Sequence, residues 1–187
     1  MDPKPSPCPA RRRLLTGAAT GAALYALPRR RALASTAKVR SLAFENLHTG
    51  ETLRTVYWEQ GQYLAQPLLD IQHLLRDYRN GQVHAIDLGL LDLLSTMRER
   101  LDCSRPIQLI SGYRSPATNA VLHARSGQVA SGSLHMQGMA ADIRVPGCAL
   151  PQLRALALSL RGGGVGYYPR SDFVHVDVGR VRQWAGS

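Results

Sequence analysis

The chain has 187 residues, of which 23 are Lys or Arg and 13 are Asp or Glu, so its formal net charge is +10. This length suits one domain plus extras, and a hydrophobic content of 44% indicates a globular protein rather than a disordered one. The sequence lacks any apolar run of about 18 residues, which excludes a multi-span membrane protein. Its three cysteines are too few for a disulfide-built miniprotein.

The N-terminal segment has the features of a secretory leader. Twin arginines and two bulky apolar residues stand in Arg11–Leu15, a mild apolar stretch follows, and Ala32–Ala34 is a small-x-small cleavage site. We expect residues 1–34 to be a twin-arginine signal peptide, read by the bacterial export machinery for folded proteins, and a periplasmic mature chain from Ser35. An uncleaved basic anchor or arm is the alternative.

Most of the positive charge belongs to this leader. Residues 1–34 contain seven basic residues and one acidic residue, which leaves a net charge of only +4 for residues 35–187. Nucleic-acid binding is therefore disfavoured, because no basic-aromatic pattern remains once the leader is removed. We likewise expect no stable membrane insertion after removal of the leader.

The domain is expected to begin with a hairpin and two helices. The hairpin would pair residues 41–46 with residues 52–59 through a turn at Gly50. Helices are expected over residues 63–78 and after a cap at Asp87. Their apolar residues at helical spacing would face the core: Leu68, Ile71, Leu75, Leu90, Leu91, Leu94, Met97 and Leu101.

The second half of the domain alternates short strands with short helices. Strands are expected at residues 107–110, 139–145, 165–168 and 173–178, and helices at residues 116–123, behind a cap at Ser115, and 150–161. Runs of helices beside short antiparallel strands indicate an α+β fold. We predict a small single domain with a central, mainly antiparallel sheet and flanking helices.

Metal-ligating side chains lie on the polar faces of two of these strands. Asp142 lies opposite the apolar face of one strand, and His175 and Asp177 lie opposite that of another. His135 precedes Asp142 by seven residues, across a bend. Catalytic zinc takes three such ligands and keeps a fourth position for water. His135, Asp142 and His175 therefore predict a zinc site, with two ligands from one hairpin and the third from a neighbouring strand.

The remaining histidines and cysteines indicate no second site. His48, His73, His84 and His123 are expected to be ordinary structural or surface residues. Cys8 belongs to the leader, so the mature domain keeps Cys103 and Cys148, which an oxidising compartment would allow to pair.

Three segments carry a family pattern in their order and spacing: Ser111–Ser115 (SGYRS), Ser133–Asp142 (SLHMQGMAAD) and Phe173–Asp177 (FVHVD). They resemble the zinc D-Ala-D-Ala carboxypeptidase and murein endopeptidase family. Residues 163–169 (GGVGYYP) and Trp184 resemble its MepK-like branch. The pattern S-x-H-x-x-G-x-A-x-D is the specific part, and the likeness covers nearly all of the expected mature chain.

The resemblance implies a small α+β fold with one zinc ion per chain and a peptidoglycan stem or cross-link peptide as substrate. By motif, His135, Asp142 and His175 would be the zinc ligands. Arg114 would face a substrate carboxylate or the scissile carbonyl, a task that suits the guanidinium fork. Ser133 matches a position that lines the substrate site.

The identity of the base and the extent of the cleft stay open. Many family members have Glu three residues before the last ligand, where this chain has Asp172, which is shorter. Strand alternation slightly favours Asp177 as the base, and a swapped arrangement, with Asp177 as ligand and His175 as base, is a further alternative. Tyr113, Tyr167 and Tyr168 are candidates for the cleft wall, although packing explains them equally well.

The predicted function is an exported zinc metallopeptidase that hydrolyses peptide bonds of peptidoglycan stems or cross-links. The alternative is a non-catalytic, zinc-containing module that binds the cell wall. D,D-cross-links, L,D-cross-links between diaminopimelates and terminal D-Ala residues are all compatible with the predicted constellation.

Overall fold

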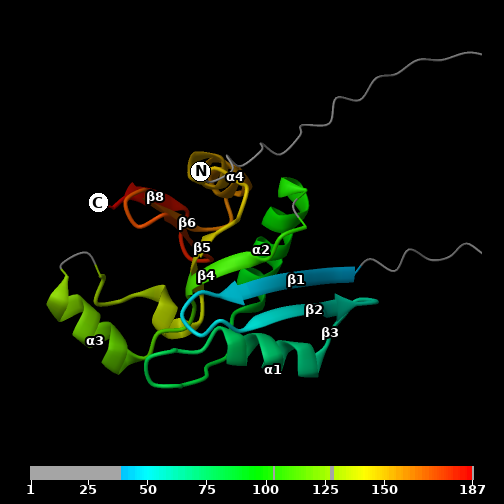
Figure 1. Ribbon diagram of the computed structural model, residues 1–187, viewed down its shortest axis with the longest axis horizontal. Helices are drawn as coiled ribbons and strands as arrows, with labels where there is room; N and C mark the ends of the chain where they lie inside the picture. Colours follow the sequence, from blue (N-terminus) through cyan, green and yellow to red (C-terminus); the bar gives the residue numbers. More distant parts are fainter. Residues whose placement is uncertain (1–38, 103, 127–128, 187) are drawn as a thin grey trace, which may run out of the picture.

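The computed structural model describes residues 39–102, 104–126 and 129–186 (Figure 1). The expected leader at residues 1–34, its cleavage point before Ser35, and Cys103 lie outside the described residues. The described chain is an α+β domain built on one eight-stranded sheet. This confirms the predicted fold class.

The sheet has the strand order β3-β2-β1-β4-β5-β7-β6-β8. In chain order its strands are β1 (Val39–Asn46), β2 (Thr52–Glu59), β3 (Gln62–Tyr63), β4 (Ile107–Ser111), β5 (Ala140–Arg144), β6 (Gly164–Tyr168), β7 (Phe173–Asp177) and β8 (Arg182–Ala185). The β1–β4 and β6–β8 pairs are parallel, and the other neighbours in the described sheet are antiparallel. The predicted hairpin is the β1–β2 pair.

The helices are α1 (Ala65–Leu74), α2 (Leu88–Leu101), α3 (Pro116–Arg125), the short 3-10 helix η1 (Leu134–Gln137) and α4 (Leu150–Leu160). Two of the predicted caps are confirmed. Asp87 accepts a hydrogen bond from the backbone N–H of Gly89 at 2.8 Å, and Ser115 accepts one from Thr118 at 3.2 Å, with Pro116 at the first helical position. Among the described residues, no helix combines the length and apolar character that a membrane span requires.

Helix α1 is shorter at both ends than the predicted helix of residues 63–78. At its start, Tyr63 belongs to β3 and Leu64 is the residue before the first helical turn, so the helix begins two residues later than expected. At its end, Asn46 Nδ2 donates to the Leu74 carbonyl at 3.0 Å, and the Tyr113 backbone N–H donates to the Leu75 carbonyl at 2.7 Å. These distant partners satisfy the terminal carbonyls, so the helix ends where they bind.

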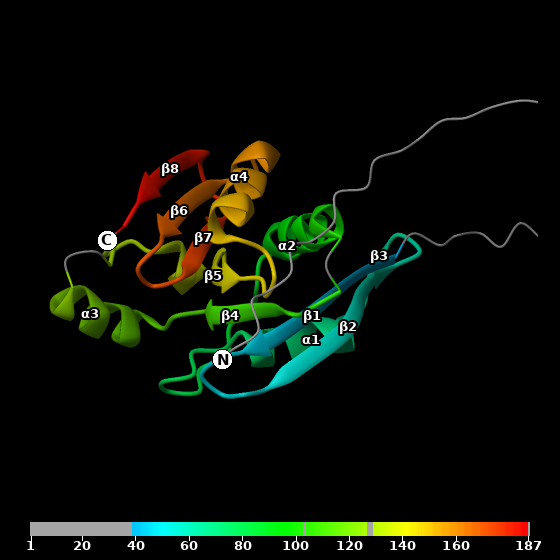
Figure 2. The same cartoon turned by 45° about the horizontal axis from the view of Figure 1, so that its top comes forward.

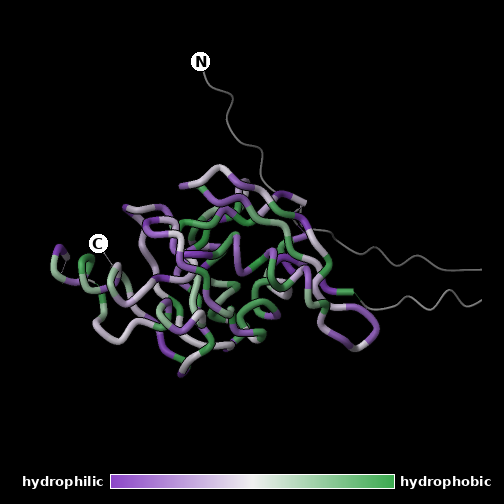
Figure 3. The backbone as a smooth tube through the Cα atoms, turned by 90° about the horizontal axis from the view of Figure 1, so that it is seen from below, coloured by the Kyte–Doolittle hydropathy of each residue, from purple (hydrophilic) through white to green (hydrophobic). Residues whose placement is uncertain are grey.

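One apolar core lies between the sheet and helices α1, α2 and α4 (Figure 2). Hydrophobic segments of the chain gather toward the middle of the molecule (Figure 3). The predicted strand faces hold, since Ile143 and Val174 are fully buried in this core. Helix α3 extends from the end of β4, away from the other helices (Figure 1). The opposite, polar faces of β5 and β7 are therefore left to form a site between α3, its following loop and the last strands.

Candidate metal centre

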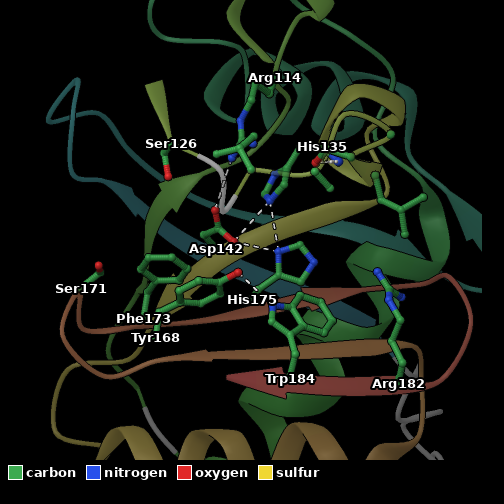
Figure 4. Close-up of a pocket in the computed structure, with 15 residues that line it drawn as sticks. Arg114, Ser126, His135, Asp142, Tyr168, Ser171, Phe173, His175, Arg182 and Trp184 are labelled. Atoms are coloured by element: carbon green, nitrogen blue, oxygen red, sulfur yellow. Dashed lines mark hydrogen bonds and ion pairs between the residues drawn. The ribbon is translucent and has the colours of Figure 1, made fainter. Parts of the chain in front are cut away.

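Three side chains from three elements meet on the polar side of the sheet. His135 lies on η1, Asp142 on β5 and His175 on β7, and Asp142 is directly paired with His175 in the sheet. His175 Nδ1 lies 2.9 Å from Asp142 Oδ1 and 3.2 Å from His135 Nε2, and His135 Nε2 lies 3.3 Å from Asp142 Oδ1. All three residues are buried, and Figure 4 shows their side chains pointing toward one another. His135, Asp142 and His175 are called the three facing groups below.

In both histidines, the ring nitrogen that points away from the cluster donates a hydrogen bond. The other ring nitrogen, which points toward the cluster, is then the one that can bind a metal ion. His135 Nδ1 donates to the Gly112 carbonyl at 2.7 Å, and His175 Nε2 donates to Asp177 Oδ2 at 3.1 Å. When a ring is neutral, it therefore turns a lone pair inward, toward the Asp142 oxygen. Tetrahedral zinc with ligand bonds of 2.0–2.2 Å holds its ligand atoms about 3.3–3.6 Å apart. The donor set therefore fits zinc, and a small outward shift of the three side chains would bring their spacing into this range.

The pKa shifts of Asp142 and His175 indicate that positive charge is favoured beside the Asp142 carboxylate. Burial raises the pKa of Asp142, but His135 and His175 outweigh this and hold it well below its usual range. Burial lowers the pKa of His175, but hydrogen bonds with Asp142 and Asp177 outweigh this and raise it to about 9. Burial lowers the pKa of His135. A divalent cation satisfies the same demand for positive charge without a proton.

The local sequence explains how His135 reaches Asp142, and here the structure differs from the expected hairpin. Ser133 caps η1 by accepting a hydrogen bond from the His135 backbone N–H at 3.4 Å. Gly138 ends η1 with φ at +66°, and a Cβ there would lie 2.1 Å from the Ala85 carbonyl oxygen. A tight helical turn, rather than a strand, therefore carries the first ligand, and only glycine fits the position that ends it.

Asp177 is fully buried behind His175, with hydrogen bonds on both of its oxygens. Oδ1 accepts from the backbone N–H groups of Gly164 and Gly179, each at 2.9 Å, and from Arg182 Nη1 at 3.1 Å. Oδ2 accepts from Arg182 Nη2 at 2.8 Å and from His175. Burial raises the pKa of Asp177, but these hydrogen bonds outweigh it and hold the pKa well below its usual range. Asp177 contacts the outer nitrogen of His175 and is not one of the three facing groups.

Asp172 has the opposite character. It lies in the turn before β7 with φ at +53°, and its side chain is 62% exposed. Its Oδ2 accepts a hydrogen bond from Arg144 Nη1 at 2.7 Å. Its chain neighbours Ser171 and Phe173 line the cavity beside the three facing groups.

Arg114 lies against the same cluster, nearly buried. Its Nη2 is 3.7 Å from Asp142 Oδ2 and 3.4 Å from Ser111 Oγ, and its Nη1 donates to Asn119 Oδ1 at 3.3 Å. Its Nε is buried and has no hydrogen-bond partner among the described residues. Burial lowers the pKa of Arg114, whereas Asp142 raises it, with burial the larger effect. A buried guanidinium with long contacts and an unpaired N–H is suited to receiving an anion.

A cavity of about 370 Å³ opens over the three facing groups, and its lining includes Arg114 and Ser133. Tyr113 is absent from the lining: its ring stacks on His84, with ring centroids 4.7 Å apart, and is buried. Asp142 is the acidic residue among those that line the cavity. Neither Asp172 nor Asp177 lines it.

An aromatic wall closes one side of the cavity. Tyr168 was a predicted candidate for the cleft and lines it, whereas Tyr167, a second candidate, is absent from the lining, and Phe173 and Trp184 were not predicted there. Trp184 lies 5.1 Å from the His175 ring, centroid to centroid, and donates from Nε1 to the Tyr168 hydroxyl at 2.9 Å. Phe173 stacks on Tyr168 with centroids 4.5 Å apart. Figure 4 shows these rings across the three facing groups from Arg114. Arg182 and Trp184 lie two residues apart and so share one face of β8. This spacing could have indicated that both line the cavity, but no strand was predicted for these residues.

A buried His–Asp–His group beneath an open cavity is the arrangement that a metal-dependent hydrolase such as a metallopeptidase requires. Residues 34–184 match the family model described as peptidoglycan L,D-endopeptidase MepK. The chain belongs to this family of hydrolases, which confirms the predicted family.

Relatives in three bacteria agree with this assignment. The chain is 46% identical over 176 residues to the peptidoglycan L,D-endopeptidase MepK of Escherichia coli K12, covering 93% of this chain and 96% of that protein. The protein of the same name in Shigella flexneri gives the same identity and coverage. The probable peptidoglycan L,D-endopeptidase MepK of Haemophilus influenzae Rd is 41% identical over 156 residues, covering 83% of this chain and 84% of that protein.

Proposed function

We propose that this chain is a zinc-dependent peptidoglycan L,D-endopeptidase of the cell envelope. The observation that carries the proposal is the set of three facing ligand atoms, 2.9–3.3 Å apart, beneath an open cavity. The sequence alone left three kinds of peptidoglycan bond open as the bond that is cut. The choice of the L,D-bond is taken from the names of the relatives.

His135 Nε2, Asp142 Oδ1 and His175 Nδ1 would hold the zinc ion. Bound zinc supplies Lewis-acid polarisation of the scissile carbonyl and lowers the pKa of its bound water toward about 7. Arg114 would hold an anionic group of the substrate, either a carboxylate beside the scissile bond or the developing oxyanion. The aromatic wall of Tyr168, Phe173 and Trp184 would bound the peptide on the other side, and Ser133 would line its path.

We assign the general base to Asp172 and a positioning role to Asp177. Asp177 accepts hydrogen bonds on both oxygens, and its strongly lowered pKa makes it a poor proton acceptor. Asp172 is exposed, and its ion pair with Arg144 is of the surface kind that costs little to break. The assignment requires the Asp172 side chain to rotate away from Arg144 toward the cavity, which its chain neighbours Ser171 and Phe173 line.

Export is the remaining part of the proposal. A peptidoglycan hydrolase must reach the cell envelope, and the twin arginines of Arg11–Leu15 support delivery to the periplasm by the twin-arginine route. Replacing Arg11 and Arg12 by lysine should leave uncleaved precursor in the cytoplasm. Periplasmic, cleaved protein from that variant would contradict the assignment of the route.

The activity is tested by incubating the chain from Ser35 onward with purified muropeptides and identifying the products by mass spectrometry. We expect zinc-dependent loss of L,D-cross-linked dimers and appearance of monomers, with D,D-cross-linked dimers left intact. Asp172→Asn should lower kcat by about 100-fold or more. Asp70→Asn, an exposed aspartate on α1 that contacts Gln66, is the matched control and should keep full activity.

The assay also separates the alternatives. Cleavage of D,D-cross-links instead would contradict the bond class. Zinc-dependent binding of muropeptides without any product would favour a cell-wall-binding module over an enzyme.

A further inference from the structure

Asn119 on α3 connects Arg114 to the loop that precedes η1. Its Oδ1 accepts from Arg114 Nη1 at 3.3 Å, and its Nδ2 donates to the carbonyls of Ala130 and Ser131 at 3.1 and 3.3 Å. The side chain is 2% exposed. Reversing the amide would turn its NH₂ toward a guanidinium and its oxygen toward two carbonyls, so these partners fix one orientation.

The bond to Asn119 is the shortest side-chain contact that holds the Arg114 guanidinium among the described residues. Ser111 Oγ and Asp142 Oδ2 lie farther away, at 3.4 and 3.7 Å. Asp142 turns Oδ1 toward the two histidines and Oδ2 toward Arg114. Asn119 is therefore one of three side chains that surround the guanidinium, and the one that also contacts the loop after α3.

The two carbonyls that Asn119 binds belong to a loop that lines the cavity. Ala130 itself lines it, as do Gly132 and Ser133 farther along the same loop. One buried amide thus ties the arginine to the neighbouring loop, and both the arginine and the loop line the cavity.

We infer that Asn119 is a positioning residue, which aims Arg114 at a carboxylate of the substrate and fixes the loop of residues 129–133 beside it. The inference rests on the proposed function. An L,D-cross-link joins two diaminopimelates, so a free carboxylate lies on the carbon next to the scissile nitrogen. Asn119 would set the preference for substrates that carry this charge, and would do so without touching the substrate.

The test compares two cross-linked muropeptides, one with this carboxylate free and one with it amidated. Wild-type protein should bind the free carboxylate with a KM about 10- to 100-fold lower, the range expected for a charge-assisted hydrogen bond to guanidinium. In Asn119→Asp, the new carboxylate pairs with Arg114 and repels the two carbonyls. We expect its preference to fall below about threefold, through a raised KM for the free carboxylate.

Thr118→Val is the matched control, because Thr118 is a buried polar residue of the same helix whose hydroxyl contacts Ser115 and not Arg114. It should lower stability but keep the wild-type preference. If Asn119→Asp does not fold, Asn119→Ser removes the same contacts without adding charge and should also lose the preference.

The outcomes separate the two claims. Cleavage of neither muropeptide by the wild-type protein refutes the proposed function. A wild-type preference that persists in the folded Asn119 variant, or equal losses for both muropeptides, refutes only the role of Asn119. If the wild-type protein cleaves both muropeptides equally well, Arg114 does not bind this carboxylate. That result also refutes the role inferred for Asn119.

Discussion

Asp177→Asn tests whether Asp177 positions a zinc ligand or acts as the base. The substitution keeps the shape of the side chain but replaces one carboxylate oxygen by NH₂. If Oδ1 is replaced, the NH₂ meets the N–H groups of Gly164 and Gly179 and Arg182 Nη1. If Oδ2 is replaced, it meets Arg182 Nη2 and His175 Nε2.

Either orientation loses at least two hydrogen bonds of a fully buried charge. A hydrogen bond to a charged group contributes about 1.5–3 kcal/mol, so unfolding should become about 3–5 kcal/mol easier. The orientation that replaces Oδ2 opposes fewer donors and is therefore favoured. In it His175 loses the acceptor that orients its ring, and loss of such a partner lowers metal affinity about 10- to 100-fold.

Zinc affinity is measured by competition with a chromophoric chelator, and stability by denaturant unfolding of the zinc-loaded protein. Asp172→Asn is the control: its exposed ion pair with Arg144 predicts unchanged zinc affinity and a stability change below about 0.5 kcal/mol. Normal zinc affinity in Asp177→Asn, together with a collapse of kcat, would refute the positioning role and make Asp177 the base.

Three further predictions concern stability. Zinc in thousandfold excess over its Kd should stabilise the domain by about 4 kcal/mol, and equal melting curves with zinc and with chelator would contradict a bound ion. Gly138→Ala should cost about 3 kcal/mol in denaturant unfolding, because φ is +66° and the Cβ would meet the Ala85 carbonyl; a cost below about 1 kcal/mol would be inconsistent with this geometry. Burial raises the pKa of Asp77, but hydrogen bonds from Thr118 and Ser115 outweigh it and lower the pKa, so its stabilising effect is present above about pH 4 and lost in acid. Asp77→Asn should therefore cost about 1–2 kcal/mol at pH 7, with the gap to wild type narrowing below pH 4, and a gap independent of pH would contradict the linkage.

The sequence predicted the parts of this fold that depend on local patterns. Strand alternation put Asp142 and His175 on the polar faces of their strands, and the paired register of β5 and β7 brings them side by side. The caps at Asp87 and Ser115 were predicted from their own side chains and the residues that follow. These features need only a few neighbouring residues to specify them.

Features fixed by distant partners could not be predicted. The end of α1 depends on Asn46 and Tyr113, which lie far from it in the sequence. Tyr113 stands beside Arg114 in the same motif, yet its ring packs on His84 and not in the cavity. Asn119 has the sequence context of an ordinary helix residue, and only the approach of the loop carbonyls makes it a connecting group.

The choice between Asp172 and Asp177 shows the same limit at the site. Alternation along β7 correctly puts Asp177 on the face of His175, but it carries no information about Gly164, Gly179 and Arg182, which occupy the Asp177 oxygens. The positive φ of Asp172 interrupts alternation at the start of β7, so strand parity does not describe where its side chain lies.

Zinc content is the most direct test of the central claim that His135, Asp142 and His175 bind one metal ion. Elemental analysis of the purified chain from Ser35 onward should find one zinc ion per chain, and His135→Ala should retain less than a tenth of it while remaining folded. A wild-type protein without stoichiometric metal, or full zinc occupancy in folded His135→Ala, would contradict the claim.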